Sequence, residues 1–296
     1  MSFKEFKCWE SIDGTAVRKQ EIDASFSMVM EQAKAIEAEY ISRTLKIRSR
    51  RLSMTVAAAA AAVLLVVTPL AAYLYLRAGT EDRLTECSVP MGEIKEITLA
   101  DGSKVTLNAG STLSYPEEFG QKRIVKLSGE ATFNVTASKT HPFIVKTDDI
   151  CVTAHGTVFN VCDYPSDLTA CATLCSGKIS VSRTRSDDKE ILLAEDHVLT
   201  YEKSTGATVV TYMKGDEATS WKNGDLIIRS MKLEQVMKVI ERKFDITVHL
   251  TTDKYVNATL TAKFINNESL VEIMDAFRKL LPGMEYVIED DNIYIR

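Results

Sequence analysis

Hydrophobic positions divide the chain into regions with different spacings. From about Glu21 onward, apolar residues recur every three or four positions, as on one face of a helix. An earlier set at intervals of three, between Phe3 and Ile12, predicts a second, shorter helix. Residues 54–76 then form a purely apolar or weakly polar stretch, long enough for about 34 Å of helix.

The region after this stretch predicts an all-β domain at residues 89–212, preceded by a linker at 77–88. Alternating runs such as Val105–Leu107 are separated by Gly, Pro, Asn and Asp, which is typical of ten or more short strands. Asp101-Gly102 predicts a hairpin with a type I′ turn, which requires positive φ at both central residues. Ser128-Gly129-Glu130 predicts another turn between two strands.

Residues 219–296 predict a small α+β domain in which a β-α-β pattern occurs twice. The first unit has a strand at 225–229 and a helix capped by Ser230. In the second unit, a strand at 259–264 leads to a helix capped by Asn267 and then to a hairpin around Asp290-Asp291. The predicted fold class is therefore multi-domain: a short α-helical segment, an apolar helix, an all-β domain and an α+β domain.

Composition and charge refine this picture. With 45% apolar and 26% charged residues, the chain is globular rather than disordered. The net charge of −5 is unevenly distributed: residues 1–53 carry ten Lys and Arg against eight Asp and Glu, and residues 77–296 carry 26 against 33. Five of the cations lie within residues 43–51, directly before the apolar stretch.

These cations give residues 54–76 an orientation. We expect one transmembrane helix with the N-terminus in the cytoplasm, because Lys and Arg concentrate on the cytoplasmic side of a span. A signal peptide has a shorter apolar region nearer the N-terminus, and a buried core helix of this length usually has a polar face. The expected location is a bacterial inner membrane, with the C-terminus in the periplasm.

The predicted cytoplasmic segment, residues 1–53, has more apolar surface than so short a chain can bury. We therefore expect it to bind a protein partner, although its helices could instead pack on each other or lie on the membrane surface. The candidate contact residues are Trp9, Ile22, Phe26, Val29, Met30 and Ile36.

Cysteine and histidine positions indicate little catalytic chemistry. If the segments around Cys162 and Cys171 form a hairpin, these two cysteines could lie opposite one another, and buried free thiols are the alternative. The four histidines lack metal-ligand spacing, so no metal or other cofactor is expected. An enzyme that uses Cys151 and His155 is conceivable, but the sequence identifies no third orienting group.

Five sequence blocks, in order, resemble the FecR family of membrane-spanning anti-sigma factors. They are VPMGEIKEITLADGSKVTLNAGSTLSYP at 89–116, RIVKLSGEATFNV at 123–135, PFIVKT at 142–147, HGTVFNV at 155–161 and SGKISV at 176–181. Thr132 and His155 depart slightly from the common pattern. WKNGDLIIRSMKLEQVMKVIERKFDI, from Trp221, is similar to the C-terminal domain of many FecR-like proteins, which itself resembles the N-terminal domain of secretins and TonB-dependent receptors.

The resemblance implies a function and a set of partners. Residues 1–53 would bind an ECF-type sigma factor, and residues 219–296 would contact the periplasmic signalling domain of a TonB-dependent transducer. The signal would cross the inner membrane through proteolysis by an intramembrane protease, without direct nucleic-acid binding or enzymatic activity. Some family members cleave themselves at a Gly-Thr bond, which corresponds to Gly156-Thr157. A membrane-tethered adaptor that binds no sigma factor is the alternative.

Overall fold

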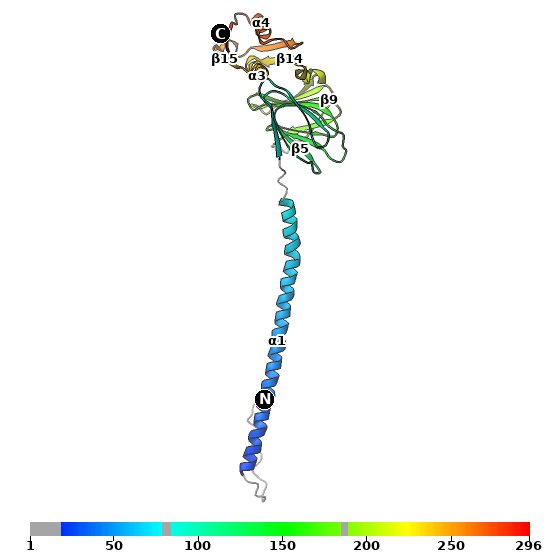
Figure 1. Ribbon diagram of the computed structural model, residues 1–296, viewed down its shortest axis with the longest axis vertical. Helices are drawn as coiled ribbons and strands as arrows, with labels where there is room; N and C mark the ends of the chain where they lie inside the picture. The colour runs from blue at the N-terminus through cyan, green and yellow to red at the C-terminus, as the bar shows by residue number, and fades with distance from the viewer. Residues whose placement is uncertain (1–18, 79–83, 185–188) are drawn as a thin grey trace. The chain divides into compact units, whose positions relative to one another are not determined.

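The computed structural model describes residues 19–78, 84–184 and 189–296, and within its first helix it describes the side chains of residues 25–45, 59 and 61–72 only. The chain divides into two units, residues 1–81 and 82–296. The first unit contains α1, a helix of 60 residues from Lys19 to Ala78 (Figure 1). Each unit is described by itself below.

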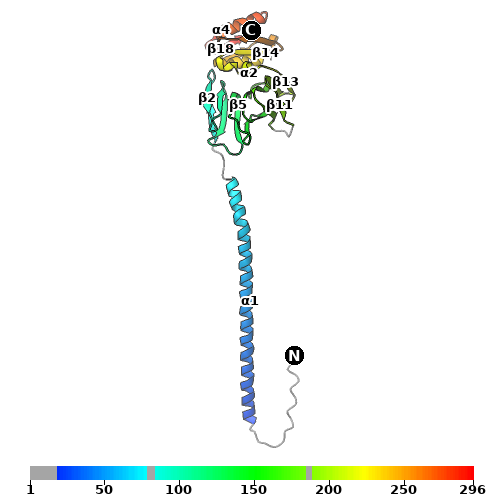
Figure 2. The ribbon, with the colours of Figure 1, turned by 90° about the vertical axis from the view of Figure 1, so that its right-hand side faces the viewer.

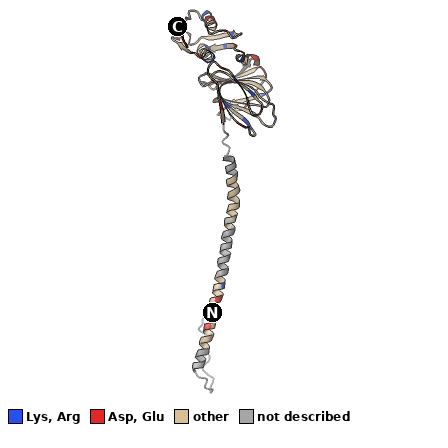
Figure 3. Cartoon of the chain, viewed as in Figure 1, with Lys and Arg blue, Asp and Glu red and all other residues tan. Residues whose placement is uncertain are grey.

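Helix α1 joins two elements that the sequence predicts separately. The helical stripe from Glu21 and the apolar stretch 54–76 lie on one continuous helix, which also includes Pro69. The earlier predicted helix, from Phe3 to Ile12, falls outside the described residues. Residues 61–72, the described part of the apolar stretch, carry no charged side chain (Figure 3). Within the described part of the chain, no helix qualifies by length and apolarity as a membrane span.

The second unit begins with the expected all-β domain, a sandwich of two sheets that share one strand (Figures 1 and 2). The first sheet contains, in spatial order, β1 (Leu84–Ser88), β4 (Thr112–Pro116), β5 (Arg123–Asn134), β6 (Phe143–Lys146), β7 (Ile150–Ala154), β10 (Ile179–Arg183) and β11 (Ile191–Leu193). The second contains β2 (Lys95–Thr98), β3 (Lys104–Leu107), β5, β8 (Val158–Asp163), β9 (Thr169–Ser176), β12 (His197–Glu202) and β13 (Thr208–Tyr212). Within the described strands of the sandwich, β5 and β6 are the one pair that runs in parallel.

Alternation of apolar residues along these strands builds the core. The inner faces of both sheets meet in one buried cluster, in which Phe133 stacks on Phe159 with ring centroids 5.2 Å apart and also contacts Phe143. The prediction of ten or more short strands is confirmed by the thirteen strands that the described residues contribute to the sandwich. Strand β1 starts at Leu84, so part of the predicted linker 77–88 belongs to the sandwich.

Strand β5 corrects one sequence-based expectation. Ser128-Gly129-Glu130 is not a turn between two strands, because it lies inside this single strand of 12 residues. Residues 123–128 pair in the first sheet and residues 129–134 in the second, so the strand passes from one sheet to the other at Gly129. Gly129 has φ of +115°, and a Cβ there would lie 2.7 Å from the Cα of Ser111. Only glycine fits this bend.

The hairpin at Asp101-Gly102 is confirmed, but its predicted turn type is wrong. Strands β2 and β3 pair in antiparallel fashion as expected. Gly102 has φ of +80°, whereas Asp101 is not among the residues with positive φ. The N–H of Gly102 donates to the carbonyl of Leu99, which gives a three-residue loop that ends in a left-handed glycine.

The C-terminal module, residues 215–296, follows the sandwich within the same unit. Its helices are α2 (Gly215–Ala218), η1 (Ser220–Asn223), α3 (Leu233–Phe244), η2 (Asp253–Tyr255) and α4 (Leu270–Leu280). Strands β14 (Leu226–Lys232) and β16 (Thr259–Phe264) form one sheet, and β15 (Thr247–Leu250), β18 (Asn292–Ile295) and β17 (Tyr286–Glu289) form another, with β18 in the middle. The two predicted β-α-β units and the Asp290-Asp291 hairpin are thus present.

Both predicted helix caps in this module are wrong. Ser230 lies within β14, at an irregularity of its pairing with β16, and has φ of +45°. Helix α3 begins three residues later, without a side-chain cap. Asn267 also has positive φ, and α4 is capped instead by Ser269, whose hydroxyl accepts from the N–H of Glu272 in a capping box.

Candidate interaction site between the sandwich and the C-terminal module

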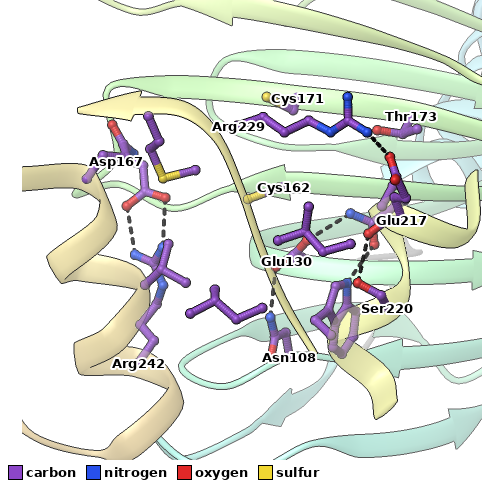
Figure 4. A pocket seen from close by; sticks show the side chains of 18 of the residues that line it. Asn108, Glu130, Cys162, Asp167, Cys171, Thr173, Glu217, Ser220, Arg229 and Arg242 are labelled. Atoms are coloured by element: carbon purple, nitrogen blue, oxygen red, sulfur yellow. Dashed lines mark hydrogen bonds and ion pairs between the residues drawn. The ribbon is translucent and has the colours of Figure 1, made fainter. Parts of the chain in front are cut away.

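A cavity of about 700 Å³ lies between the second sheet of the sandwich and the C-terminal module (Figure 4). Its floor is the outer face of this sheet, and its opposite wall comes from β14 and α3. Because side chains alternate along strands, the residues that point away from the core form rows across the sheet. One row is Glu130, Cys162, Cys171 and Thr200, on β5, β8, β9 and β12.

Glu130 is a half-buried carboxylate held by two amides. Its Oε2 accepts from Asn108 Nδ2 and its Oε1 from Asn160 Nδ2, each at 2.8 Å. Burial raises the pKa of Glu130, and the two amide hydrogen bonds oppose this rise. Asn160 Oδ1 in turn accepts from Thr132 Oγ1 at 2.9 Å. The sequence analysis missed Glu130, because its motif resembles an ordinary turn.

The loop between β8 and β9 forms one end of the cavity. The predicted hairpin at this position is confirmed, with Cys162 directly opposite Cys171. The hydroxyl of Tyr164 donates to the carbonyl of Ala109 at 2.8 Å, and Lys203 Nζ donates to the carbonyl of Tyr164 at 2.8 Å. These bonds connect the loop to neighbouring segments of the sandwich.

This loop binds the C-terminal module through Arg242 of α3. The guanidinium donates to Asp167 through Nη1 at 2.7 Å and Nη2 at 2.9 Å, and lies 3.8 Å from the ring centroid of Tyr164. Arg242 and Asp167 are only 8% and 7% exposed. Burial alone would lower the pKa of Arg242, but the hydrogen bonds and charge of Asp167 raise it above its ordinary value. The charged form of Arg242 is therefore favoured by its contact with Asp167.

Further hydrogen bonds join the sandwich to the module, and two of them involve side chains that line the cavity. Trp221 Nε1 donates to Asn160 Oδ1 at 3.3 Å, which connects η1 to the Glu130 network. The N–H of Leu168 donates to Gln235 Oε1 of α3 at 3.2 Å. Arg229 and Glu217 form an ion pair at the cavity rim. Polar groups from both parts are thus matched in pairs, as at a specific interface.

Among the described residues, no candidate metal cluster lines the cavity. No group of three or more His, Cys, Asp or Glu side chains among them could bind a metal ion. No histidine lines the cavity, and burial raises the pKa of both Cys162 and Cys171. The polar contacts across the cavity hold the sandwich and the C-terminal module together.

The predicted cleavage bond lies outside this cavity. Gly156 follows β7 and has φ of +138°, and a Cβ there would lie 2.6 Å from Ala137. The hydroxyl of Thr157 donates to the carbonyl of Lys178 at 3.0 Å. Cleavage between Gly156 and Thr157 stays a prediction. His155, which the enzyme alternative uses, is exposed and lies 3.4 Å from the carbonyl of Ser138 through Nδ1.

The candidate partner-binding residues lie on α1 as far as the structure describes them. Phe26, Val29 and Ile36 are 61–69% exposed, and Met30 is half-buried. Trp9 and the side chain of Ile22 fall outside the described residues. At 100° per residue, the positions from 22 to 36 that carry this set lie on one face of the helix. These positions thus form one stripe on α1, and the role of this stripe in partner binding stays a prediction.

Fold and site together define a two-module protein, in which a β-sandwich holds a small α+β module through buried polar contacts. The family model of the FecR protein matches residues 85–180, and the model of the FecR C-terminal domain matches residues 225–295. Two crystal structures of a candidate anti-sigma factor from Parabacteroides distasonis ATCC 8503, at 2.50 and 1.65 Å resolution, match with a TM-score of 0.68 each. They are 30% and 29% identical to this chain, and each match covers 72% of this chain and 98% of the other.

The chain belongs to the FecR family of anti-sigma factors. Among curated protein sequences, none matches the chain significantly. The FecR anti-sigma factors are a regulatory family.

Proposed function

We propose that this protein is a single-pass inner-membrane anti-sigma factor that carries a signal from a TonB-dependent outer-membrane transducer to a cytoplasmic ECF sigma factor. The family membership supports the class of function. The observation that carries the sigma-binding part is the exposed apolar stripe of α1, including Phe26, Val29 and Ile36. A row of apolar side chains exposed to water is unfavourable for an isolated helix, so we infer that a protein partner buries this stripe.

The mode of binding follows from the shape of the segment. A single amphipathic helix offers no core of its own, so it inhibits by laying its apolar face into a groove of the sigma factor. Residues 54–76 serve as the membrane span and the cations of residues 43–51 keep the stripe in the cytoplasm. A lone span lacks packed neighbours that would give it two discrete arrangements, so proteolysis in or near the span is the proposed route of the signal.

Sigma binding is tested by capture from the full chain, solubilised from membranes in detergent. The stripe variant carries Ile22→Asp, Phe26→Asp and Val29→Asp. Loss of three buried apolar contacts should weaken sigma capture by at least about 100-fold.

The matched control puts the same three charges on the opposite face of α1. Met28→Asp, Ala35→Asp and Ala38→Asp replace exposed apolar residues there. The control should capture sigma as the natural chain does. Equal loss in both variants would contradict a specific helix face, and absence of any sigma factor from the natural chain's captures would favour the adaptor function.

We propose that the C-terminal module contacts the transducer's periplasmic signalling domain. Strands β15 and β17 are the outer strands of its three-stranded sheet, and an exposed edge can accept a further strand from a partner. Val287 and Ile288 of β17 are 39% and 36% exposed. Deletion of residues 215–296 should abolish the response of a sigma-dependent reporter to the transducer's substrate; a retained response would contradict this contact.

A further inference from the structure

The row Glu130, Cys162, Cys171, Thr200 brings two cysteines face to face across β8 and β9. Both side chains line the cavity, and Figure 4 shows their sulfur atoms on neighbouring strands of its floor. Among the strand registers of the described residues, this is the one place where a cysteine is paired with a cysteine. The five described cysteines are free thiols in the structure.

The backbone geometry suits a disulfide at this position. Directly opposed residues of antiparallel strands have Cα atoms about 4.5 or 5.5 Å apart, depending on the hydrogen-bonding pattern. Disulfides span Cα separations of about 4.4–6.8 Å, so both cases fall within the range. Cys171 Sγ now donates to Thr200 Oγ1 at 3.6 Å, on the β12 side. Closure requires the Cys171 side chain to turn toward β8 and to give up this weak bond.

We propose that Cys162 and Cys171 are a redox modification site, which closes a reversible cross-strand disulfide and thereby fixes the loop that holds the C-terminal module. The ring closed by this bond contains both Tyr164 and Asp167, which contact the guanidinium of Arg242. Oxidation removes alternative conformations of the loop when the contact is broken, so it favours the docked module. The inference rests on the proposed function in one respect only: the proposed periplasmic location supplies the oxidising compartment in which the disulfide forms.

The oxidant is a disulfide, either of a small molecule or of an oxidoreductase. In the first exchange, one cysteine loses its proton and its thiolate attacks the oxidant; a mixed disulfide forms and one thiolate leaves and takes up a proton. In the second, the other cysteine does the same to the mixed disulfide and releases the second thiol. Two protein thiols are oxidised and one disulfide is reduced. Because burial raises the pKa of both thiols, closure should be slow at neutral pH and faster as the pH rises.

The site is tested on residues 82–296, which form a compact unit with their own cores. Relatives that match 72% of this chain over nearly their whole length crystallised, which supports the use of this fragment. The reduced fragment is equilibrated with oxidised glutathione, the remaining thiols are alkylated, and peptides are mapped by mass spectrometry. We expect a Cys162–Cys171 disulfide, with Cys151 and Cys175 alkylated. Alkylation of both Cys162 and Cys171, a stable glutathione adduct on either, or pairing with another cysteine would overturn the proposal.

Thermal unfolding gives the second readout. Closing a ring of this size should raise the unfolding midpoint by roughly 5–10 °C in the natural sequence. The Cys151→Ala control should show the same rise, and Cys162→Ala should show none. An equal rise in Cys162→Ala would contradict the proposal.

Alkylation of the full chain in intact cells separates this inference from the proposed function. If the pair closes in the purified fragment but is reduced in cells, the proposed periplasmic location is wrong and the site stands. If it fails to close in the purified fragment, the site is wrong whatever the location.

Discussion

Replacement of Arg242 by methionine tests the contact between the sandwich and the C-terminal module. Methionine keeps the apolar stem but removes both hydrogen bonds to Asp167 and the charge over the ring of Tyr164. Asp167 is then a buried carboxylate whose one remaining side-chain partner in the described residues is Ser166, at 3.3 Å. Breaking a buried pair in this way costs about 3–5 kcal/mol of unfolding free energy, and the loss of the cation–π contact is part of this cost.

The assay is urea unfolding of residues 82–296, followed by two probes. Trp221 is the single tryptophan of this fragment and lies at the contact, so its fluorescence reports undocking, while circular dichroism reports both modules. In the natural sequence the two transitions should coincide. In Arg242→Met, fluorescence should change at lower urea. Arg278→Met, at an exposed pair with Asp275, is the control and should change stability by less than about 1 kcal/mol.

A double-mutant cycle decides whether the two residues act through each other. Asp167→Asn alone should destabilise, and its combination with Arg242→Met should cost less than the sum of the two single changes, by at least about 2 kcal/mol. Additive effects within about 0.5 kcal/mol would refute the reasoning, because independent sites behave in that way.

Three further predictions concern single positions. Gly129→Ala should lower the free energy of unfolding of the sandwich in urea by at least about 3 kcal/mol, because the new Cβ collides with Ser111. In the control Gly120→Ala, the new Cβ meets nothing within 4 Å, and the free energy of unfolding should change by less than about 0.5 kcal/mol. The folded-state pKa of Glu130 is raised above the ordinary value of 4.5 that applies to the unfolded chain. At a pH between the unfolded-state pKa and the folded-state pKa, the folded protein therefore binds more protons than the unfolded chain. The stability difference between the natural sequence and Glu130→Gln should therefore fall as the pH rises through that window, and a flat or rising difference would contradict burial as the cause. Self-cleavage at Gly156-Thr157 would give two fragments on a denaturing gel and one intact band in Thr157→Ala; an intact natural chain would refute it.

Local patterns in the sequence determined most of the elements. Alternation marked the strands, and helical spacing marked α3 and α4, because these periods arise from backbone geometry that every residue shares. The Asp101-Gly102 hairpin and the facing pair Cys162 and Cys171 followed from the same local reasoning, since a short loop fixes the register of its two strands. The resemblance at residues 89–181 gave the family.

The tertiary structure alone decided where distant residues meet. Arg242 and Asp167 are 75 positions apart, and nothing in either local pattern marks them as partners, since both look like ordinary surface charges. From the sequence, Glu130 resembles a turn residue. In the structure, β5 crosses from one sheet to the other, and the Glu130 side chain therefore faces the cavity beneath the C-terminal module. The helix caps were missed for a related reason: Ser230 and Asn267 adopt positive φ, imposed by the strands and loops around them. Periodicity fixes which side of an element is apolar, but the energy of burying a polar group depends on what packs against it.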